Sequence, residues 1–251
     1  MPTDTLSKAT RTVAITGATS GIGFRLAERL GAKGWSVAAL GRNRRELDRL
    51  AAAIGDRCLP IEADVSDETE VIRAFAEIAR VFGRLDALAA CAGISDATPF
   101  EEIDAEHFTR ILQVNTVGTF LCMREALKTM ESGGRICTVS SVAGVRGGGV
   151  FGTAAYSASK GALIALTKTA ARTFAPRNIT VNCVVPGSTH TPMLDQYWND
   201  EAQRERVRAM IPIGRPGTSD EIASAIEWVI SEESGFMTGS TIVVDGGLTM
   251  L

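Results

Sequence analysis

The stretch ITGATSGIGFRLA, residues 15–27, joins a short apolar run to an amphipathic segment through three glycines. The run before them, residues 11–16, predicts a buried strand, and residues 21–34 predict a helix that stops at a glycine. Such glycines allow a tight turn, close approach of the backbone to a phosphate and close packing of a helix on a sheet. They are Gly17, Gly21 and Gly23. Their place in the first strand-to-helix turn predicts a dinucleotide site, and the spacing G-x-x-x-G-x-G leaves a generic turn as the alternative.

The remaining chain repeats this alternation of strands and helices. Strands are predicted at residues 35–40, 57–63, 85–93, 134–141, 178–187 and 239–247, and helices at residues 44–55, 66–83, 105–131, 155–174 and 219–231. Ser66 is the predicted N-cap of the third helix. Strict alternation predicts an α/β fold with a parallel sheet that is covered on both faces. One segment, residues 189–210, breaks the rhythm and predicts an inserted helical flap.

Length and composition limit the partners of this protein. The chain has 251 residues, a net charge of −3 and a sequence pI of about 5.6. These values fit one α/β domain over residues 1–251 and disfavour nucleic acid and anionic membranes as partners. The amino-terminal residues lack the apolar core of a signal peptide, and no apolar run is long enough to cross a bilayer. The scattered cysteines form no metal-binding pair, so we expect no metal site and a reducing, cytoplasmic setting.

The end of the second predicted strand bears on the choice of dinucleotide. An NAD-binding protein usually carries a carboxylate there for the ribose hydroxyls; this chain has Gly41, followed by Arg42. A guanidinium can hold a 2′-phosphate in a fork, so NADP(H) is favoured over NAD(H). The alternative is that Arg42 is a surface charge. Asp64, at the end of the third strand, is placed to accept a hydrogen bond from an adenine amino group or, alternatively, to begin a helix.

The segment YSASK, residues 156–160, opens a long apolar helix. Tyr156 and Lys160 are four positions apart in this segment and therefore share a helix face. A cation held there favours the phenolate and predicts a tyrosine pKa below about 10. Such a pair suits a proton transfer; the alternative is a tyrosine at the boundary of a buried helix.

Taken in order, these motifs resemble the short-chain dehydrogenase/reductase family over nearly the whole chain. The resemblance is carried by TGATSGIG, DVSD, CAG, VNTVGTF, SS, YSASK, NITVNCVVPG and DGG, at residues 16–23, 64–67, 91–93, 114–120, 140–141, 156–160, 178–187 and 245–247. It implies a Rossmann-like, doubly wound parallel sheet of about seven strands in a single domain. It also implies a homotetramer.

The resemblance implies a role for each of four side chains. Tyr156 is expected as general acid/base, and Lys160 is expected to bind the nicotinamide ribose and to lower the tyrosine pKa. Ser141 is expected to hydrogen-bond the substrate oxygen, and Asn115 to sit in a helix and anchor a water molecule for proton relay. The residues expected to bind the cofactor are Gly17, Thr19, Ser20, Gly21, Ile22, Gly23, Arg42, Asp64, Val65, Cys91, Ala92, Gly93, Tyr156, Lys160, Pro186, Gly187, Thr189 and Thr191.

Two features depart from the family pattern. The usual Asn-Asn-Ala-Gly is replaced by ACAG, residues 90–93, so we expect main-chain contacts with the cofactor there in place of two side-chain amides. The segment between the serine pair and Tyr156 is slightly longer than is common, which leaves Ser140 as an alternative to Ser141. Ser141 is favoured because SVAG aligns better from that side.

The substrate pocket is expected at the carboxyl ends of the strands, among residues 94–100, residues 145–155 and the flap. The flap residues expected to line it are Met193, Leu194, Tyr197 and Trp198. A small or medium, mostly apolar alcohol or ketone is therefore the expected substrate. Arg146 is a candidate for a substrate carboxylate and His190 for a substrate contact, with solvent exposure as the alternative for Arg146.

These residues predict an NADP-dependent oxidoreductase that interconverts a secondary alcohol and a ketone by hydride transfer, with Tyr156 as general acid/base. A cytoplasmic setting favours carbonyl reduction. Two alternatives remain, namely NAD-dependent alcohol oxidation and NADPH binding by a catalytically inert regulator. A Ser-His-Asp hydrolase is disfavoured because VSSVAG, residues 139–144, lacks the G-x-S-x-G elbow.

Overall fold

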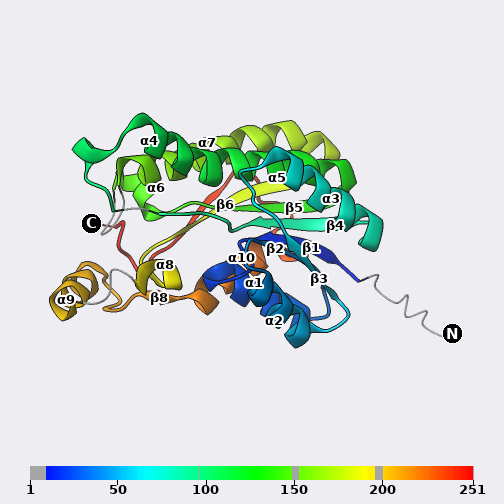
Figure 1. The fold of residues 1–251 in the computed structure, drawn as a ribbon, viewed down its shortest axis with the longest axis horizontal. Helices are drawn as coiled ribbons and strands as arrows, with labels where there is room; N and C mark the ends of the chain where they lie inside the picture. The colour runs from blue at the N-terminus through cyan, green and yellow to red at the C-terminus, as the bar shows by residue number, and fades with distance from the viewer. Residues whose placement is uncertain (1–9, 96, 149–152, 196–199, 251) are drawn as a thin grey trace.

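The computed structural model describes residues 10–95, 97–148, 153–195 and 200–250. Seven parallel strands form its main sheet in the order β3-β2-β1-β4-β5-β6-β9, and β7 pairs separately with β8 (Figure 1). The strands are β1 (Thr12–Thr16), β2 (Ser36–Gly41), β3 (Cys58–Glu62), β4 (Leu85–Ala90), β5 (Met130–Val139), β6 (Thr180–Pro186), β7 (Thr189–His190), β8 (Gly217–Thr218) and β9 (Thr241–Val244). The α/β class and the seven-stranded parallel sheet expected from the sequence are confirmed.

Helices cover both faces of this sheet (Figure 1). On one face lie α1 (Gly21–Ala32), α2 (Arg44–Ile54) and α10 (Ser219–Val229), and on the other α3 (Glu68–Phe82), α4 (Ala105–Leu112), α5 (Gly118–Thr129) and α7 (Ala154–Phe174). The first layer buries Leu26, Leu30 and Ile226, and the second buries Phe75 and Ile78. Burying a side chain of this size contributes about 1.5–3 kcal/mol. Among the described residues, no helix is both long enough and apolar enough to cross a bilayer.

The strand order reverses beside β1. The chain runs outward from β1 through β2 to β3 and then returns to β4, on the other side of β1. The carboxyl ends of β1 and β4 therefore open a crevice between the connections that follow them. Gly17 lies at this crevice with a φ of 67°, and a Cβ there would be 2.9 Å from backbone atoms of Ala92. The turn therefore requires glycine, both for its left-handed backbone and for this close approach.

The single helix expected at residues 105–131 is interrupted. Helix α4 passes into a π-helical turn, η2 (Gln113–Val117), before α5, and the chain enters β5 at Met130. A π turn accommodates an extra residue and often marks a functional site. Asn115 lies in this turn with no exposed surface, and its side chain forms hydrogen bonds outside its own helix. The expectation of one regular helix is wrong at the point where this buried amide is positioned.

The expected flap, residues 189–210, contains β7, α8 (Pro192–Asp195) and α9 (Glu201–Met210). An apolar cluster joins α9 to the sheet and to the carboxyl-terminal segment. Its buried members are Val142, Cys183, Val185, Val207, Ile211 and Leu248. Tyr197 and Trp198, which were expected to line the substrate pocket, lie outside the described residues.

A short helix, α6 (Val142–Arg146), precedes the segment at residues 145–155 and ends at its first two residues. That segment was expected to line the substrate pocket. The Ser141 hydroxyl caps α6 by accepting from the backbone N–H of Ala143 at 3.2 Å. The helix ends at Gly147, whose φ of 75° is left-handed. Residues 149–152 of the same segment lie outside the described residues. Further 3₁₀ turns are η1 (Phe100–Glu102), η3 (Ala175–Arg177) and η4 (Glu232–Ser234).

Helix α3 has a different N-cap from the one expected. The carboxylate of Asp67 accepts from the backbone N–H of Thr69 at 2.8 Å and from that of Glu70 at 3.1 Å. The Ser66 hydroxyl instead donates to Asp64 Oδ1 at 2.6 Å. The assignment of Ser66 as the cap is therefore wrong, because a neighbouring carboxylate engages its hydroxyl and Asp67 is left to satisfy the first turn.

Replacing Asp67 tests the cap. Asp67→Ala is expected to lower the free energy of unfolding by about 1 kcal/mol, because two backbone N–H groups lose their acceptor. Asp67→Asn keeps an acceptor oxygen and is expected to retain most of the stability. Urea unfolding followed by circular dichroism measures both variants, and an Asp67→Ala protein as stable as the wild type would contradict the assignment.

Candidate active site

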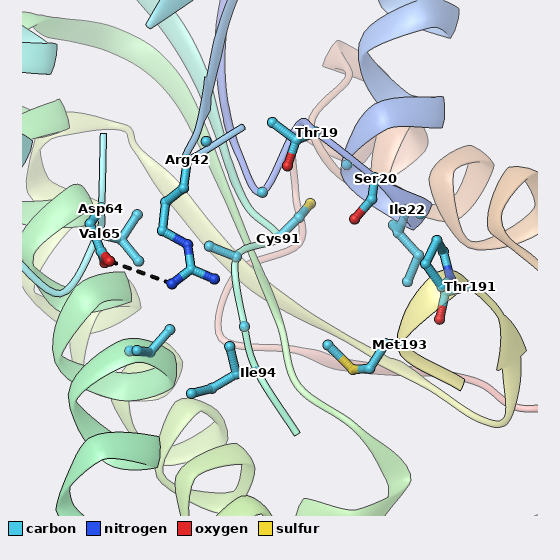
Figure 2. A pocket seen from close by; sticks show the side chains of 18 of the residues that line it. Thr19, Ser20, Ile22, Arg42, Asp64, Val65, Cys91, Ile94, Thr191 and Met193 are labelled. Carbon is cyan, nitrogen blue, oxygen red and sulfur yellow. Dashed lines mark ion pairs between the residues drawn. The ribbon is translucent and has the colours of Figure 1, made fainter. Parts of the chain in front are cut away.

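A cavity of about 230 Å³ opens at the crevice between β1 and β4 (Figure 2). Its walls come from the glycine turn, from the ends of β2, β3 and β4 and from the start of the flap. The expected cofactor residues among them are Gly17, Thr19, Ser20, Gly21, Ile22, Gly23, Arg42, Asp64, Val65, Cys91, Ala92, Gly93 and Thr191. The fold thus brings together residues from five separate segments that the sequence had assigned to one cofactor.

The amino end of α1 meets this cavity without a capping side chain. Its N-cap, Ser20, makes no side-chain cap hydrogen bond, and the first turn contains no acidic residue. The first-turn N–H groups and the positive end of the helix dipole therefore remain available to an anion. Gly23 packs so closely that a Cβ there would lie 2.5 Å from the carbonyl oxygen of Gly17. These features fit a phosphate of a dinucleotide.

Arg42 and Asp64 face one another across one end of the cavity (Figure 2). Arg42 Nη1 lies 3.6 Å from Asp64 Oδ2, and the two side chains are 64% and 32% exposed. Asp64 Oδ1 also accepts from the backbone N–H of Ser66 at 2.9 Å. Burial alone would raise the pKa of Asp64, but the hydrogen bonds from Ser66 and the charge of Arg42 hold that pKa below its usual value. The carboxylate is therefore ionised at neutral pH. Arg42 is paired with this anion on one side and remains exposed to solvent on the other.

A second cavity, of about 150 Å³, continues from the first. The two share the side chains of Ile22, Cys91, Thr191 and Met193. The remaining expected residues in its wall are Ser141, Tyr156, Pro186, Gly187 and Thr189. No charged residue is found among the described residues that line it, and Val142, Ala143 and Leu194 give it an apolar side. A neutral molecule held there would lie next to one held in the first cavity.

Ser141 and Tyr156 line this cavity together, and the interaction of the Ser141 side chain with the phenol favours ionisation of the tyrosine. Ser140, the alternative candidate, has its hydroxyl turned to the main chain of α7, where it donates to the carbonyl of Lys160 at 2.7 Å. Both serines border the cavity, but only Ser141 joins the tyrosine. The geometry therefore supports Ser141 as the partner of Tyr156.

Lys160 lines neither of these two cavities and is only 5% exposed. Its ammonium donates to the carbonyl oxygen of Val139 at 2.9 Å and lies 5.8 Å from the centre of the Tyr156 ring. Burial lowers the pKa of Lys160 to about 8. Burial also raises the pKa of Tyr156 above its ordinary value, and the hydrogen bond from Ser141 only partly opposes this. The expectation that Lys160 lowers the tyrosine pKa is therefore wrong for the protein alone, since loss of hydration dominates and the ammonium is drawn to a carbonyl.

Asn115 connects the loop after β4 to α7. Its Nδ2 donates to the carbonyl of Ile94 and to the Ser159 hydroxyl, both at 2.9 Å, and its Oδ1 accepts from the N–H of Ile94 at 2.8 Å. A Cβ on Gly93 would lie 3.2 Å from both Asn115 Oδ1 and Lys160 Nζ. Ser159 and the Val139 carbonyl were not foreseen. Ser159 lies inside YSASK, where its spacing from Tyr156 offered a signal, but a backbone carbonyl leaves none in a sequence.

The other polar candidates lie outside the two cavities. Arg146 donates to the carbonyl of Leu248 at 3.3 Å and is exposed, and His190 is exposed on β7. Neither residue lines the cavity that contains Tyr156. Within the described residues, no group of three or more His, Cys, Asp or Glu side chains is placed to hold a metal ion.

The lowered pKa of Lys160 predicts a pH dependence of stability. The unfolded chain binds the lysine proton up to a pKa of about 10.5, whereas the folded chain releases it at about 8. Between these values unfolding takes up a proton, so the destabilising effect of the buried charge is full below pH 8 and declines as pH rises. Relative to Lys160→Met, the wild type is expected to gain about 1–3 kcal/mol of unfolding free energy from about pH 7 to about pH 10.

The matched control is Lys168→Met, because Lys168 is on the same helix and is exposed. The difference in unfolding free energy between Lys168→Met and the wild type is expected to stay constant over the same pH range. Cysteines and tyrosines that titrate in this range are common to all three proteins and cancel. Guanidinium unfolding at several pH values measures the effect, and equal curves for the two lysine variants would contradict the buried charge.

The sequence of this chain is similar to those of known proteins over nearly its whole length. A family model described as Enoyl-(Acyl carrier protein) reductase matches residues 17–249. Nodulation protein G of Rhizobium sp. (strain N33) is 38% identical over 243 residues, which cover 96% of this chain and 98% of that protein. The 2,5-dichloro-2,5-cyclohexadiene-1,4-diol dehydrogenase of Sphingobium indicum (strain B90A) is 35% identical, with 96% and 98% covered.

A solved structure and a further relative add to these. The crystal structure of a short-chain dehydrogenase/reductase, titled glucose/ribitol dehydrogenase, from Brucella melitensis superposes with a TM-score of 0.91 at 34% identity, covering 96% of this chain and 97% of that one. The 2-dehydro-3-deoxy-L-rhamnonate dehydrogenase (NAD(+)) of Sphingomonas sp. (strain SKA58) is 36% identical, with 96% of each chain covered. The relatives thus include dehydrogenases, and one carries NAD(+) in its name.

Proposed function

The chain belongs to the short-chain dehydrogenase/reductase family and is an oxidoreductase of that family, and from this premise we propose that it is an NADP-dependent enzyme that interconverts a secondary alcohol and a ketone. The observation that carries the proposal is that Ser141 and Tyr156 stand together in the wall of an uncharged cavity that adjoins the glycine-lined crevice. A substrate oxygen there meets two hydroxyl groups.

The crevice fits a dinucleotide on two observations. Side chains at Gly17 and Gly23 would clash with the backbone of Ala92 and of Gly17, respectively, so these glycines let the turn pack closely. The first turn of α1 offers N–H groups to an anion. Bound there, NADPH supplies a hydride for the carbonyl carbon of the substrate. Residues of the glycine turn, together with Cys91, Ala92 and Gly93, would hold its phosphates and ribose mainly through the backbone.

The proton chemistry then belongs to the residues of the second cavity. Tyr156 is protonated at neutral pH because burial raises its pKa, so its hydroxyl is ready to donate a proton to an oxygen that becomes an alkoxide. Ser141 donates a hydrogen bond to the same oxygen and stabilises its developing charge. We propose carbonyl reduction as the direction, in which the protonated tyrosine is the acid. Asn115 and Lys160 lie behind the tyrosine and position it.

The walls of the second cavity indicate the substrate class. Its lining combines hydroxyls, such as those of Ser95 and Ser141, with the apolar side chains of Val142 and Leu194, and its described residues carry no charge. A carboxylate or phosphate on the substrate would lack a partner there. We therefore propose an uncharged alcohol or ketone of small or medium size, and Arg146, which donates to Leu248, is not proposed as a carboxylate reader.

NAD-dependent alcohol oxidation is the second candidate. The ion pair between Arg42 and Asp64 supports it, because a guanidinium already paired gains less from a 2′-phosphate. The name of the Sphingomonas relative points the same way for that protein. NADP remains the first candidate because position 41 carries no carboxylate and Arg42 borders the crevice. An inert NADPH-binding regulator is disfavoured by the intact pair of Ser141 and Tyr156.

We also propose that the protein is a cytoplasmic homotetramer. Apolar side chains remain exposed on two helices, with Phe120 of α5 46% exposed and Trp228 of α10 44% exposed, and β9 is an edge strand. Contacts between copies of the chain would cover such surfaces. Three of the cysteines are buried free thiols, which suits a reducing compartment.

Tyr156→Phe tests the catalytic assignment. The variant is expected to lower turnover at least about a hundredfold, because phenylalanine keeps the ring but cannot donate the proton. The dissociation constant for NADPH is expected to change little. Absorbance at the nicotinamide band across a panel of ketones measures turnover, and titration of protein fluorescence measures binding. A variant that turns over at the wild-type rate would show that another group supplies the proton.

Arg42→Ala tests the choice of dinucleotide. Loss of a charge-assisted fork is expected to weaken NADPH binding about tenfold or more and to leave NADH binding nearly unchanged. Arg49→Ala is the matched control, because Arg49 lies on α2 and pairs with Glu46 outside the crevice. Equal loss for both dinucleotides in Arg42→Ala would contradict a phosphate-binding role and favour the NAD-dependent alternative.

A further inference from the structure

Gly41 ends β2 at the edge of the crevice, directly against the side chain of Thr19. A Cβ built on Gly41 would lie 2.5 Å from Thr19 Cγ2 and 3.2 Å from Thr19 Oγ1. The first distance is far shorter than any real contact between carbons. Gly41 is a strand residue and does not have a left-handed φ. The backbone at this position therefore tolerates other residues, and the three atoms nearest to such a Cβ all belong to the Thr19 side chain.

The backbone of Thr19 has little freedom to move away from Gly41. The residue before it, Ala18, is fully buried and donates its N–H to the carbonyl of Leu40 at 3.0 Å. This hydrogen bond fastens the glycine turn to the last part of β2, so the turn and the strand end keep a fixed separation. Thr19 itself is half-buried and lines both the crevice and an adjoining hollow that also contains Arg42, Arg44 and Arg45.

The end of β2 is where a carboxylate would receive the ribose hydroxyls of NAD. We propose that Thr19 and Gly41 form a steric pair that keeps every side chain, and hence a carboxylate, out of this position. The cofactor preference is then set by Thr19 of the glycine turn and Gly41 of β2 together with Arg42, and a carboxylate at position 41 becomes useful only when Thr19 is also replaced by a smaller residue. This inference rests on the proposed dinucleotide-dependent function and adds a determinant of its cofactor specificity.

The first test measures the steric pair in the protein without any dinucleotide. Gly41→Ala is introduced into the wild type, into Thr19→Val and into Thr19→Ala. Valine keeps the methyl group and removes the hydroxyl, whereas alanine removes both and leaves a Cβ at an ordinary 3.4 Å. Gly41→Ala is expected to lower the melting temperature by about 4 °C or more in the first two backgrounds and by less than half as much in the third. An equal drop in all three would overturn the pair.

The second test measures dinucleotide binding by fluorescence titration. Gly41→Asp alone is expected to weaken both NADPH and NADH, because the carboxylate displaces the glycine turn. Thr19→Ala combined with Gly41→Asp is expected to bind NADH at least about tenfold more tightly than Gly41→Asp alone, while NADPH stays weak. If Gly41→Asp alone binds NADH as tightly as the double variant, the pair does not control specificity.

The two tests separate this inference from the proposed function. If the melting temperatures behave as expected but no variant, nor the wild type, binds either dinucleotide, the steric contact stands and the cofactor role is overturned together with the proposed function. If the wild type binds NADPH but the melting temperatures show no dependence on Thr19, the proposed function stands and the steric pair is overturned.

Discussion

The ammonium of Lys160 is buried at the point where β5, α6 and α7 meet, and its hydrogen bond to the Val139 carbonyl joins α7 to the end of β5. Around it the backbones approach closely, since a Cβ on Gly144 of α6 would lie 2.6 Å from the carbonyl carbon of Lys160. The Ser140 hydroxyl adds a further bond from the end of β5 to α7. A charge so poorly hydrated costs stability, so its retention at this place is best understood through the tyrosine one helical turn before it.

The same lack of water that makes the lysine costly sets the state of Tyr156. Burial disfavours both the phenolate and the ammonium. It therefore raises the pKa of Tyr156 and lowers the pKa of Lys160. The protein alone therefore holds a protonated phenol beside a substrate-sized neutral cavity. A positive charge brought into the crevice by an oxidised nicotinamide would act on both groups at short range in a medium of low dielectric constant. In this account the chain supplies a poised acid, and the cofactor supplies the charge that makes it a base for the reverse reaction.

Much of the fold could be predicted because its signals are local. Uninterrupted apolar strands, alternating helices and glycines in the first turn predicted the sheet, and the structure brings residues assigned to the cofactor, such as Gly17, Cys91 and Thr191, to the wall of one cavity. Local signals were insufficient where two similar residues compete, as Ser66 and Asp67 do for the cap of α3. They were also insufficient at Asn115, because a π turn differs from a regular helix only in its backbone hydrogen bonds, and the side-chain bonds that Asn115 makes there reach Ile94 and Ser159, far along the chain. The tyrosine pKa was mispredicted since burial of a side chain is a property of the whole fold.

The most direct measurement is the titration of Tyr156 by NMR with tyrosine labelled at the ring carbon that bears the hydroxyl. The chain contains two tyrosines, Tyr156 and Tyr197, so two signals suffice for the assignment. In the protein alone, Tyr156 is expected to titrate above about 10, and saturating NADP⁺ is expected to move its pKa downward by a unit or more. A Tyr156 pKa that is the same with and without NADP⁺ would contradict the account, because the positive charge of the oxidised nicotinamide would then have no effect on the phenol.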